Sequence, residues 1–266
     1  MHWNGKSWGF FLRIDVEHQE AYKYCGDWRV TPVGTRLLLD LFEEMETKHT
    51  FCVVGITAEF LPHVIGQIRD AGHCITGHSM FHIAYGGCSL REQTSDMARM
   101  NRTIKQSVGV EVRGLAAPFH GLVDENTPQA AHDAGLTYLA GHSLFNQQSL
   151  LPAQMKLKDG HILIMNPPHP AKRGASDWTD RRQGSPWFEG VFSPQVARQQ
   201  WYAGIDHAAE YGGAFHLVVH PWMLHANEGE LYVVKDVIAY ARQKEAWIGT
   251  WDELITLHID YQEVDE

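Results

Sequence analysis

The hexapeptide Gly77-His78-Ser79-Met80-Phe81-His82 follows directly on a short apolar run, and the rest of the chain can be arranged around it. Its two histidines are four residues apart. They therefore meet on one face of a helical turn, or on a tight loop, close enough to share one metal ion. Such a site needs at least one more ligand, which must come from another part of the chain.

An acidic pair supplies the best candidate for that ligand. Asp15 and Glu17 end the apolar run Phe10-Phe11-Leu12-Arg13-Ile14-Asp15-Val16-Glu17, where a strand would give way to a loop. Taken alone, the pair could simply mark a strand end that meets solvent. Together with the two histidines, it predicts a metal site of two imidazoles and one carboxylate, with the second carboxylate left over as a base.

Helices and short apolar strands alternate along the first third of the chain. Thr31-Pro32 opens a helix over 31–48, because Thr is a favoured N-cap and Pro fits the first turn. A strand over 50–55, a helix over 57–72 and a strand over 73–76 follow. This β-α-β-α-β order predicts a parallel sheet or barrel, whose active site gathers at the carboxyl ends of the strands. The two acids and two histidines all fall there.

The remaining elements continue the pattern without a linker, a repeat or a shift in composition. Apolar runs and helical periods predict strands over 110–118, 136–140, 162–165, 215–220 and 246–250, and helices over 90–107, 125–134, 194–212, 229–243 and 252–258. Residues 166–194 show neither period. This segment reads either as a lid or binding loop or as a surface insertion. One domain over 1–266 is the economical interpretation.

Composition narrows the classes of protein. The chain is 44% apolar and 20% charged with a formal net charge of -10, which is typical of a soluble globular protein and argues against a basic nucleic-acid-binding face. Four cysteines without C-x-x-C spacing argue against a disulfide framework or a cysteine zinc site. No run reaches the length of a membrane span, and residues 1–6 lack the pattern of a secretory signal, so we expect no transmembrane segment and a cytoplasmic location.

The ordered motifs resemble those of the NodB-type polysaccharide deacetylases, carbohydrate esterase family 4. The family has an acidic motif after its first strand, then His-Ser/Thr-x-x-His, an Arg-x-Pro segment and a late Leu-His-type motif. Here these correspond to Arg13-Ile14-Asp15-Val16-Glu17, to His78-Ser79-Met80-Phe81-His82 and to Val218-Val219-His220-Pro221. The acidic spacing is similar to the branch of lipid-linked aminoarabinose deformylases. The closing segment 247–254 is similar to that of cofactor-free allantoinases.

The resemblance implies a fold and a set of roles. The fold would be a distorted (β/α)7-type barrel in a single domain. Asp15 would be the catalytic base and His220 the general acid, while Glu17, His78 and His82 would hold a divalent metal, most simply zinc. The substrate would lie against the residues that follow two of the strands, namely Pro118, Phe119, His120 and Trp222. His216, inside an apolar run, reads as a core residue.

Two family residues have no counterpart in this chain. The arginine that steadies the base carboxylate aligns with Ala116, and the aspartate that tunes the acid histidine aligns with Leu139. Arg113, His120 and His142 lie close to these positions in the sequence and are the candidates to compensate. Arg113 stands three positions before Ala116, an odd offset that would place it on the opposite face of a strand.

Three functions are consistent with this pattern. The first is a metal-dependent N-deacetylase or deformylase acting on an amino-sugar precursor, nucleotide- or lipid-linked, in the biosynthesis of a surface polysaccharide or glycan. The second is an allantoinase-like amidase on a small nitrogenous metabolite. The third is a catalytically silent protein that binds sugar or metal on the same scaffold. The sequence leaves the oligomeric state open.

Overall fold

A computed structural model describes residues 3–17, 30–121, 123–140, 152–165, 194–221 and 229–264. The chain divides into two compact units, each made of two segments. The first contains Met1–His49 and Pro168–Thr250, and the second contains Thr50–Pro167 and Trp251–Glu266. The expectation of one domain over 1–266 stays a prediction, and the two units are described one at a time.

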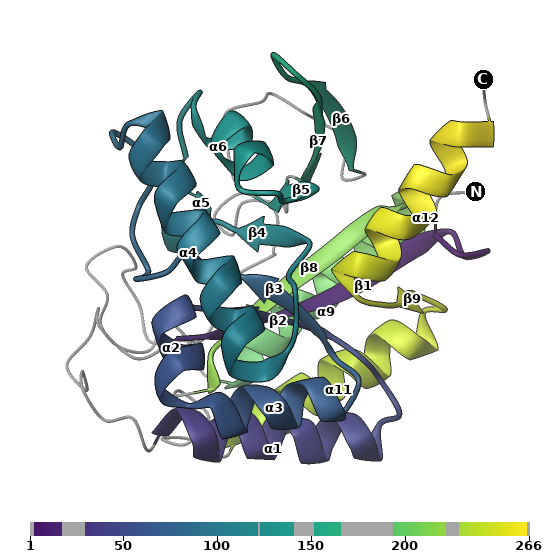
Figure 1. The fold of residues 1–266 in the computed structure, drawn as a ribbon. Helices are drawn as coiled ribbons and strands as arrows, with labels where there is room; N and C mark the ends of the chain where they lie inside the picture. Colours follow the sequence, from purple (N-terminus) through teal and green to yellow (C-terminus); the bar gives the residue numbers. More distant parts are fainter. Residues whose placement is uncertain are drawn as a thin grey trace. The chain divides into compact units, whose positions relative to one another are not determined.

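The first unit is built on the strand β1 (Trp8–Val16), all nine residues of which are buried. It pairs in parallel with β8 (Gly213–Val219) and with β9 (Trp247–Ile248), as Figure 1 shows for the purple and green strands. A strand covered on both faces has no solvent side, and its sequence is therefore a nearly continuous apolar run. The unit's helices are α1 (Val30–Glu44), α9 (Pro194–Tyr211) and α11 (Gly229–Gln243).

The second unit carries a longer series of strands. The parallel strands lie in the order β2 (Thr50–Val53), β3 (Cys74–Gly77), β4 (Gly114–Ala116), β5 (Tyr138–Ala140) and β7 (His161–Met165). An antiparallel strand, β6 (Ala153–Lys156), pairs with β7. The helices are α2 (Gly55–Phe60), α3 (Pro62–Asp70), α4 (Leu90–Val108), α5 (Pro118–Gly121), α6 (Thr127–Asp133) and α12 (Trp251–Val264).

Local chemistry explains where these helices begin and end. Helix α4 starts with a capping box between Ser89 and Glu92 and stops at Gly109, whose φ of 73° suits glycine. The single helix expected over 57–72 is wrong, because the chain forms α2 and α3 instead. The residue before a proline is disfavoured in a helix, and Leu61, with φ −124° and ψ 48°, breaks the helix just before Pro62.

The predicted α/β fold class, with helices between parallel strands, is confirmed. Within each unit, the pairings among the described strands run in a line and close no complete barrel. Two details differ from expectation: the strand predicted over 110–118 is only Gly114–Ala116, and the antiparallel strand β6 was not predicted. The segment 166–194, read as a lid or an insertion, lies outside the described residues except for Pro194. No helix in the described part of the chain is both long and apolar enough to cross a membrane.

Candidate functional site

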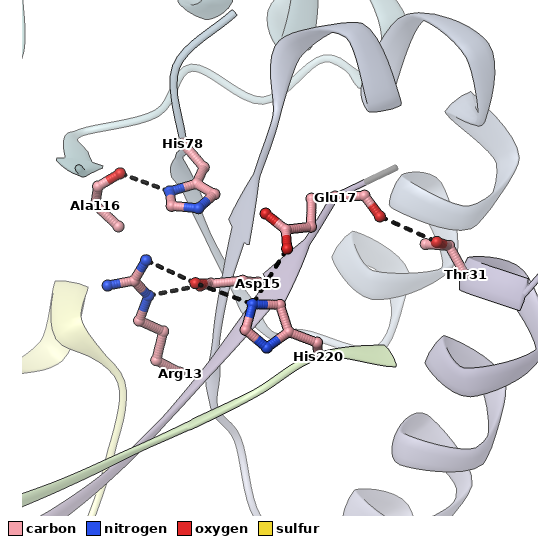
Figure 2. A network of polar contacts seen from close by, with 7 residues as sticks. All are labelled: Arg13, Asp15, Glu17, Thr31, His78, Ala116 and His220. Atoms are coloured by element: carbon pink, nitrogen blue, oxygen red, sulfur yellow. Dashed lines mark hydrogen bonds and ion pairs between the residues drawn. The ribbon is translucent and has the colours of Figure 1, made fainter. Parts of the chain in front are cut away.

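In the first unit, Asp15 near the end of β1 is bound by an arginine of the same strand. The Nε atom of Arg13 lies 2.5 Å from Oδ1 of Asp15, and its Nη2 atom lies 2.7 Å from Oδ2 (Figure 2). The two side chains are only 8% and 6% exposed. Residues two apart in a strand share a face, so the guanidinium meets the carboxylate along the strand. The result is a buried, bidentate ion pair, the strongest geometry for these two groups.

Arg13 was not among the residues predicted for the site. The predicted replacement for the absent arginine was Arg113, which is close to Ala116 in the sequence. The Nη1 atom of Arg113 lies 2.9 Å from Oγ1 of Thr256 and 3.4 Å from the carbonyl oxygen of Asp252, both on α12. The available signal was a cation two positions before the acid, inside an otherwise apolar strand. A buried charge of that kind requires a partner.

The strand register brings His220 to the same place. Strands β1 and β8 are parallel and pair as far as Ile14 with Val219, so Asp15 and His220 occupy the next positions at the carboxyl ends. The Nε2 atom of His220 lies 3.8 Å from Oδ2 of Asp15 and 3.2 Å from Oε1 of Glu17 (Figure 2). All three side chains are buried. The first unit therefore brings together the predicted base, the predicted acid and one predicted metal ligand.

In the second unit, the two histidines of the hexapeptide lie on a tight loop after β3 and not on a helical turn. The ring centroids of His78 and His82 are 5.0 Å apart. Ser79 and His82 have φ values of 60° and 56°, a region that costs energy for residues other than glycine. Such backbone is kept only where its surroundings hold it, and it is common at functional sites.

The neighbouring helix α4 helps to hold this loop. The carboxylate of Asp96 accepts hydrogen bonds from the backbone N–H of Met80 at 2.9 Å and from the hydroxyl of Tyr85 at 2.8 Å. Burial raises the pKa of Asp96, against the lowering effect of these two donors. Within the loop, the Ser79 hydroxyl also accepts a hydrogen bond from the N–H of Ile83.

His78 is oriented by the backbone of the next strand. Its Nδ1 atom lies 2.7 Å from the carbonyl oxygen of Ala116 (Figure 2). A carbonyl oxygen can only accept, so the contact requires a proton on Nδ1, and in the neutral ring the lone pair is then on Nε2. Metal-binding histidines are typically fixed in this way by a partner on the other ring nitrogen. Ala116, where the family arginine is absent, thus contributes through its backbone.

The predicted substrate contacts and compensating residues are only partly described. The Phe119 ring lies 4.6 Å from that of His82 and is 42% exposed, whereas Pro118 is buried. His120 belongs to α5, but its side chain is not described; Trp222 and His142 lie outside the described residues.

Two further predictions concern core positions. His216, read as a core residue, is 4% exposed and stacks on Phe11 with ring centroids 5.1 Å apart. Burial, with a smaller contribution from the charge of Arg13, lowers its pKa to about 3, so the ring is neutral at physiological pH. Leu139, at the position of the absent family aspartate, is buried in β5.

The residues predicted as metal ligands offer one carboxylate, Glu17 of the first unit, and two imidazoles, His78 and His82 of the second unit. Imidazole nitrogen and carboxylate oxygen are ligands that suit zinc and several other divalent ions. The lone pair that the Ala116 contact leaves on His78 fits this use. The residues present are therefore chemically suited to a divalent metal.

Comparison with known proteins also points to the polysaccharide deacetylases. Residues 27–139 match the family model for polysaccharide deacetylase. Over 106 residues the chain is 29% identical to the chitooligosaccharide deacetylase of Sinorhizobium fredii, covering 40% of this chain and 49% of that relative. The chain thus spans about half the length of this curated relative.

Solved structures confirm the fold. A Mycobacterium smegmatis protein assigned to the polysaccharide deacetylases is similar with a TM-score of 0.80 and 22% identity, over 98% of this chain and 92% of the other. An allantoinase is similar with a TM-score of 0.77 and 16% identity, over 96% and 92%. At these identities the likeness concerns the fold alone. Together with the matched family model, it confirms the resemblance to the NodB-type polysaccharide deacetylases that was read from the motifs.

Proposed function

We propose that this protein is a metal-dependent hydrolase of a carbon-nitrogen bond other than a peptide bond, which removes an acetyl or formyl group from an amino-sugar precursor. The observation that carries the proposal is the buried group of Asp15, its bidentate partner Arg13 and the adjacent His220. A relative that is named as a chitooligosaccharide deacetylase supports the substrate class.

In this proposal Glu17, His78 and His82 hold the metal, with zinc as the first candidate. When bound, a divalent ion polarises the amide carbonyl and lowers the pKa of the attacking water. The donor set supports this assignment, as does the proton that the Ala116 carbonyl fixes on Nδ1 of His78.

Proton transfer falls to two residues of the first unit. Asp15 takes the proton of the attacking water, since its carboxylate is an acceptor that Arg13 holds in place. His220 then protonates the departing nitrogen through Nε2, the ring atom that faces the carboxylates. The Asp15 carboxylate and the His220 ring lie close together, which supports a mechanism in which Asp15 accepts a proton and His220 donates one.

The proposal also includes the class of the natural substrate. We infer an acylated amino sugar linked to a nucleotide or a lipid, handled in the cytoplasm during glycan synthesis.

The test is release of acetate from N-acetylglucosamine oligomers and from a nucleotide-linked N-acetylamino sugar, with formyl analogues in parallel. Asp15→Asn should lower turnover by about 10²–10⁴-fold, the usual contribution of general base catalysis. The matched control is Asp40→Asn, on the exposed Arg36 ion pair of α1. No acyl release by the zinc-loaded protein from any of these compounds would refute the proposed function.

The allantoinase-like amidase is the second candidate, favoured by the fold likeness to an allantoinase. Turnover of allantoin that survives exhaustive chelation would establish it in place of the deacetylase. A silent binding protein is disfavoured by Arg13, because the buried pair keeps a base where the family motif expects one.

A further inference from the structure

The base carboxylate is held by a residue of its own strand. Both oxygens of Asp15 are contacted by Arg13, one by Nε and one by Nη2. A guanidinium is a planar, rigid fork, so two parallel contacts fix the plane of the carboxylate as well as its position. A lysine would supply the charge without the second contact.

The strand that carries this pair is itself rigidly placed. β1 is paired on one side with β8, where Arg13 is opposite Val218, and on the other side with β9. Every residue of β1 is buried, so the guanidinium has little room for another rotamer. Because the β1 backbone and the Arg13 side chain are fixed in place, Arg13 fixes the position of the Asp15 carboxylate.

The Arg13–Asp15 contact also bears on the family arginine that this chain lacks. In the family motif the arginine that steadies the base precedes a proline, and this chain has Ala116 there, before Ala117-Pro118. The backbone of Ala116 serves His78 instead. Arg113, the other arginine near that position, contacts Thr256.

We propose that Arg13 is the positioning residue for the base Asp15, and that it takes over from within β1 the role of the arginine that Ala116 replaces. The inference rests on the proposed function for its kinetic part. Arg13 acts through Asp15: it orients the oxygen that accepts the proton of water, and Asp15 performs the transfer.

The kinetic test compares Arg13→Lys with the natural protein on the acylated amino sugar that it turns over. A misplaced base should lower kcat by about 10–10²-fold, whereas KM should change by less than about 3-fold. The metal content of the variant should equal that of the natural protein, since the arginine is not a ligand. In Arg13→Ala, added guanidinium chloride at millimolar concentration should restore part of the lost kcat.

Two kinetic results would overturn the proposal. One is an Arg13→Lys variant with full kcat. The other is a loss of kcat in Arg113→Leu with none in Arg13→Lys, which would assign the role to the second arginine.

A stability test decides the pairing without any substrate. Arg13→Leu removes the guanidinium that pairs with the buried Asp15 carboxylate and should lower Tm strongly. Arg13→Leu combined with Asp15→Leu should have a higher Tm than Arg13→Leu alone, because the stranded charge is gone. If the separate shifts in Tm of Arg13→Leu and Asp15→Leu add up to the shift of the double variant, the residues are not coupled and the proposal fails. If the natural protein turns over no acylated amino sugar while this coupling is found, the proposed function fails and the Arg13–Asp15 pairing stands.

Discussion

The Nδ1 atom of His78 lies 2.7 Å from the carbonyl oxygen of Ala116, a backbone atom that no substitution of a side chain can remove. The contact fixes the ring tautomer before any ligand arrives and leaves Nε2 as the basic nitrogen. A pre-oriented imidazole loses less conformational freedom when a metal binds. We therefore expect metal binding to be most sensitive to substitution of His78.

We expect the purified protein to contain about one equivalent of a divalent metal and His78→Ala to contain almost none. Elemental analysis of both samples, after zinc addition and desalting, measures this directly. His63→Ala, an exposed histidine of α3 in the same unit, is the matched control and should keep its metal. Absence of metal from all three samples would contradict the predicted ligand set.

Strand order alone was enough to predict that Asp15 and His220 lie close together, as their side chains do. Asp15 and His220 each lie at the end of an apolar strand, and parallel strands bring their carboxyl ends together. Their meeting in the first unit depends on the β1–β8 register, which extends to Ile14 and Val219. Neighbouring strand ends are therefore predictable when the strands themselves are strongly apolar.

The missed features depend on contacts that no periodic pattern encodes. The role of Arg13 was not predicted because the family motif has its arginine at the position of Ala116, although the alternation of side chains along a strand places Arg13 on the same face as Asp15. The break at Leu61 was missed because the apolar positions of α2 and α3 continue one helical period across Pro62. Strand β6 alternates half-buried and exposed residues without an apolar face, so the sequence carries little strand signal.

A second prediction concerns acid stability and His216. Burial lowers the pKa of this ring from 6.5 to about 3, so between these values the unfolded chain binds a proton that the folded chain does not. Stability is therefore lost as pH falls from 6.5 toward 3, by up to about 1.4 kcal/mol per pH unit from this group. His216→Leu removes the titration, and its free energy of unfolding should fall less steeply.

Urea unfolding at pH 7, 5.5 and 4 would measure the slopes of the two proteins. The exposed His63→Leu serves as control, because its ring is not buried in the folded state. Equal slopes for His216→Leu and the natural protein would mean that the buried ring is not responsible for the acid sensitivity.

A third prediction tests Phe119 as a substrate contact. Its ring is 42% exposed and lies 4.6 Å from that of His82, on a backbone with φ 52°. A flat apolar ring on exposed, strained backbone is suited to packing against a sugar. Phe119→Ala should raise KM by about 5–30-fold, equivalent to about 1–2 kcal/mol of binding, with a smaller effect on kcat.

Phe60→Ala is the matched control for this variant, since Phe60 is a still more exposed phenylalanine of the same unit, on α2. Steady-state kinetics on the same acylated sugar compares the two. If KM were equally raised in both, the effect would reflect general surface apolarity, and a specific contact at Phe119 would be refuted.

The last prediction uses two glycines of two helices. In α1, a Cβ atom added to Gly34 would overlap the carbonyl oxygen of Pro221, the residue after His220. In α3, a Cβ atom added to Gly66 would meet nothing within 4 Å. The same substitution therefore has opposite expected effects. Gly66→Ala should stabilise the protein by about 0.5–1 kcal/mol, because alanine loses less backbone entropy in a helix.

Gly34→Ala should instead destabilise it by about 1–3 kcal/mol, since either α1 or the Pro221 backbone must move. Because Pro221 adjoins the proposed general acid, kcat should also fall, and metal content should not. Thermal unfolding, elemental analysis and steady-state kinetics on both variants separate these effects. A Gly34→Ala variant with the natural Tm and kcat would show that α1 does not pack against the strand end that carries His220, and the placement of the acid in this site would then be wrong.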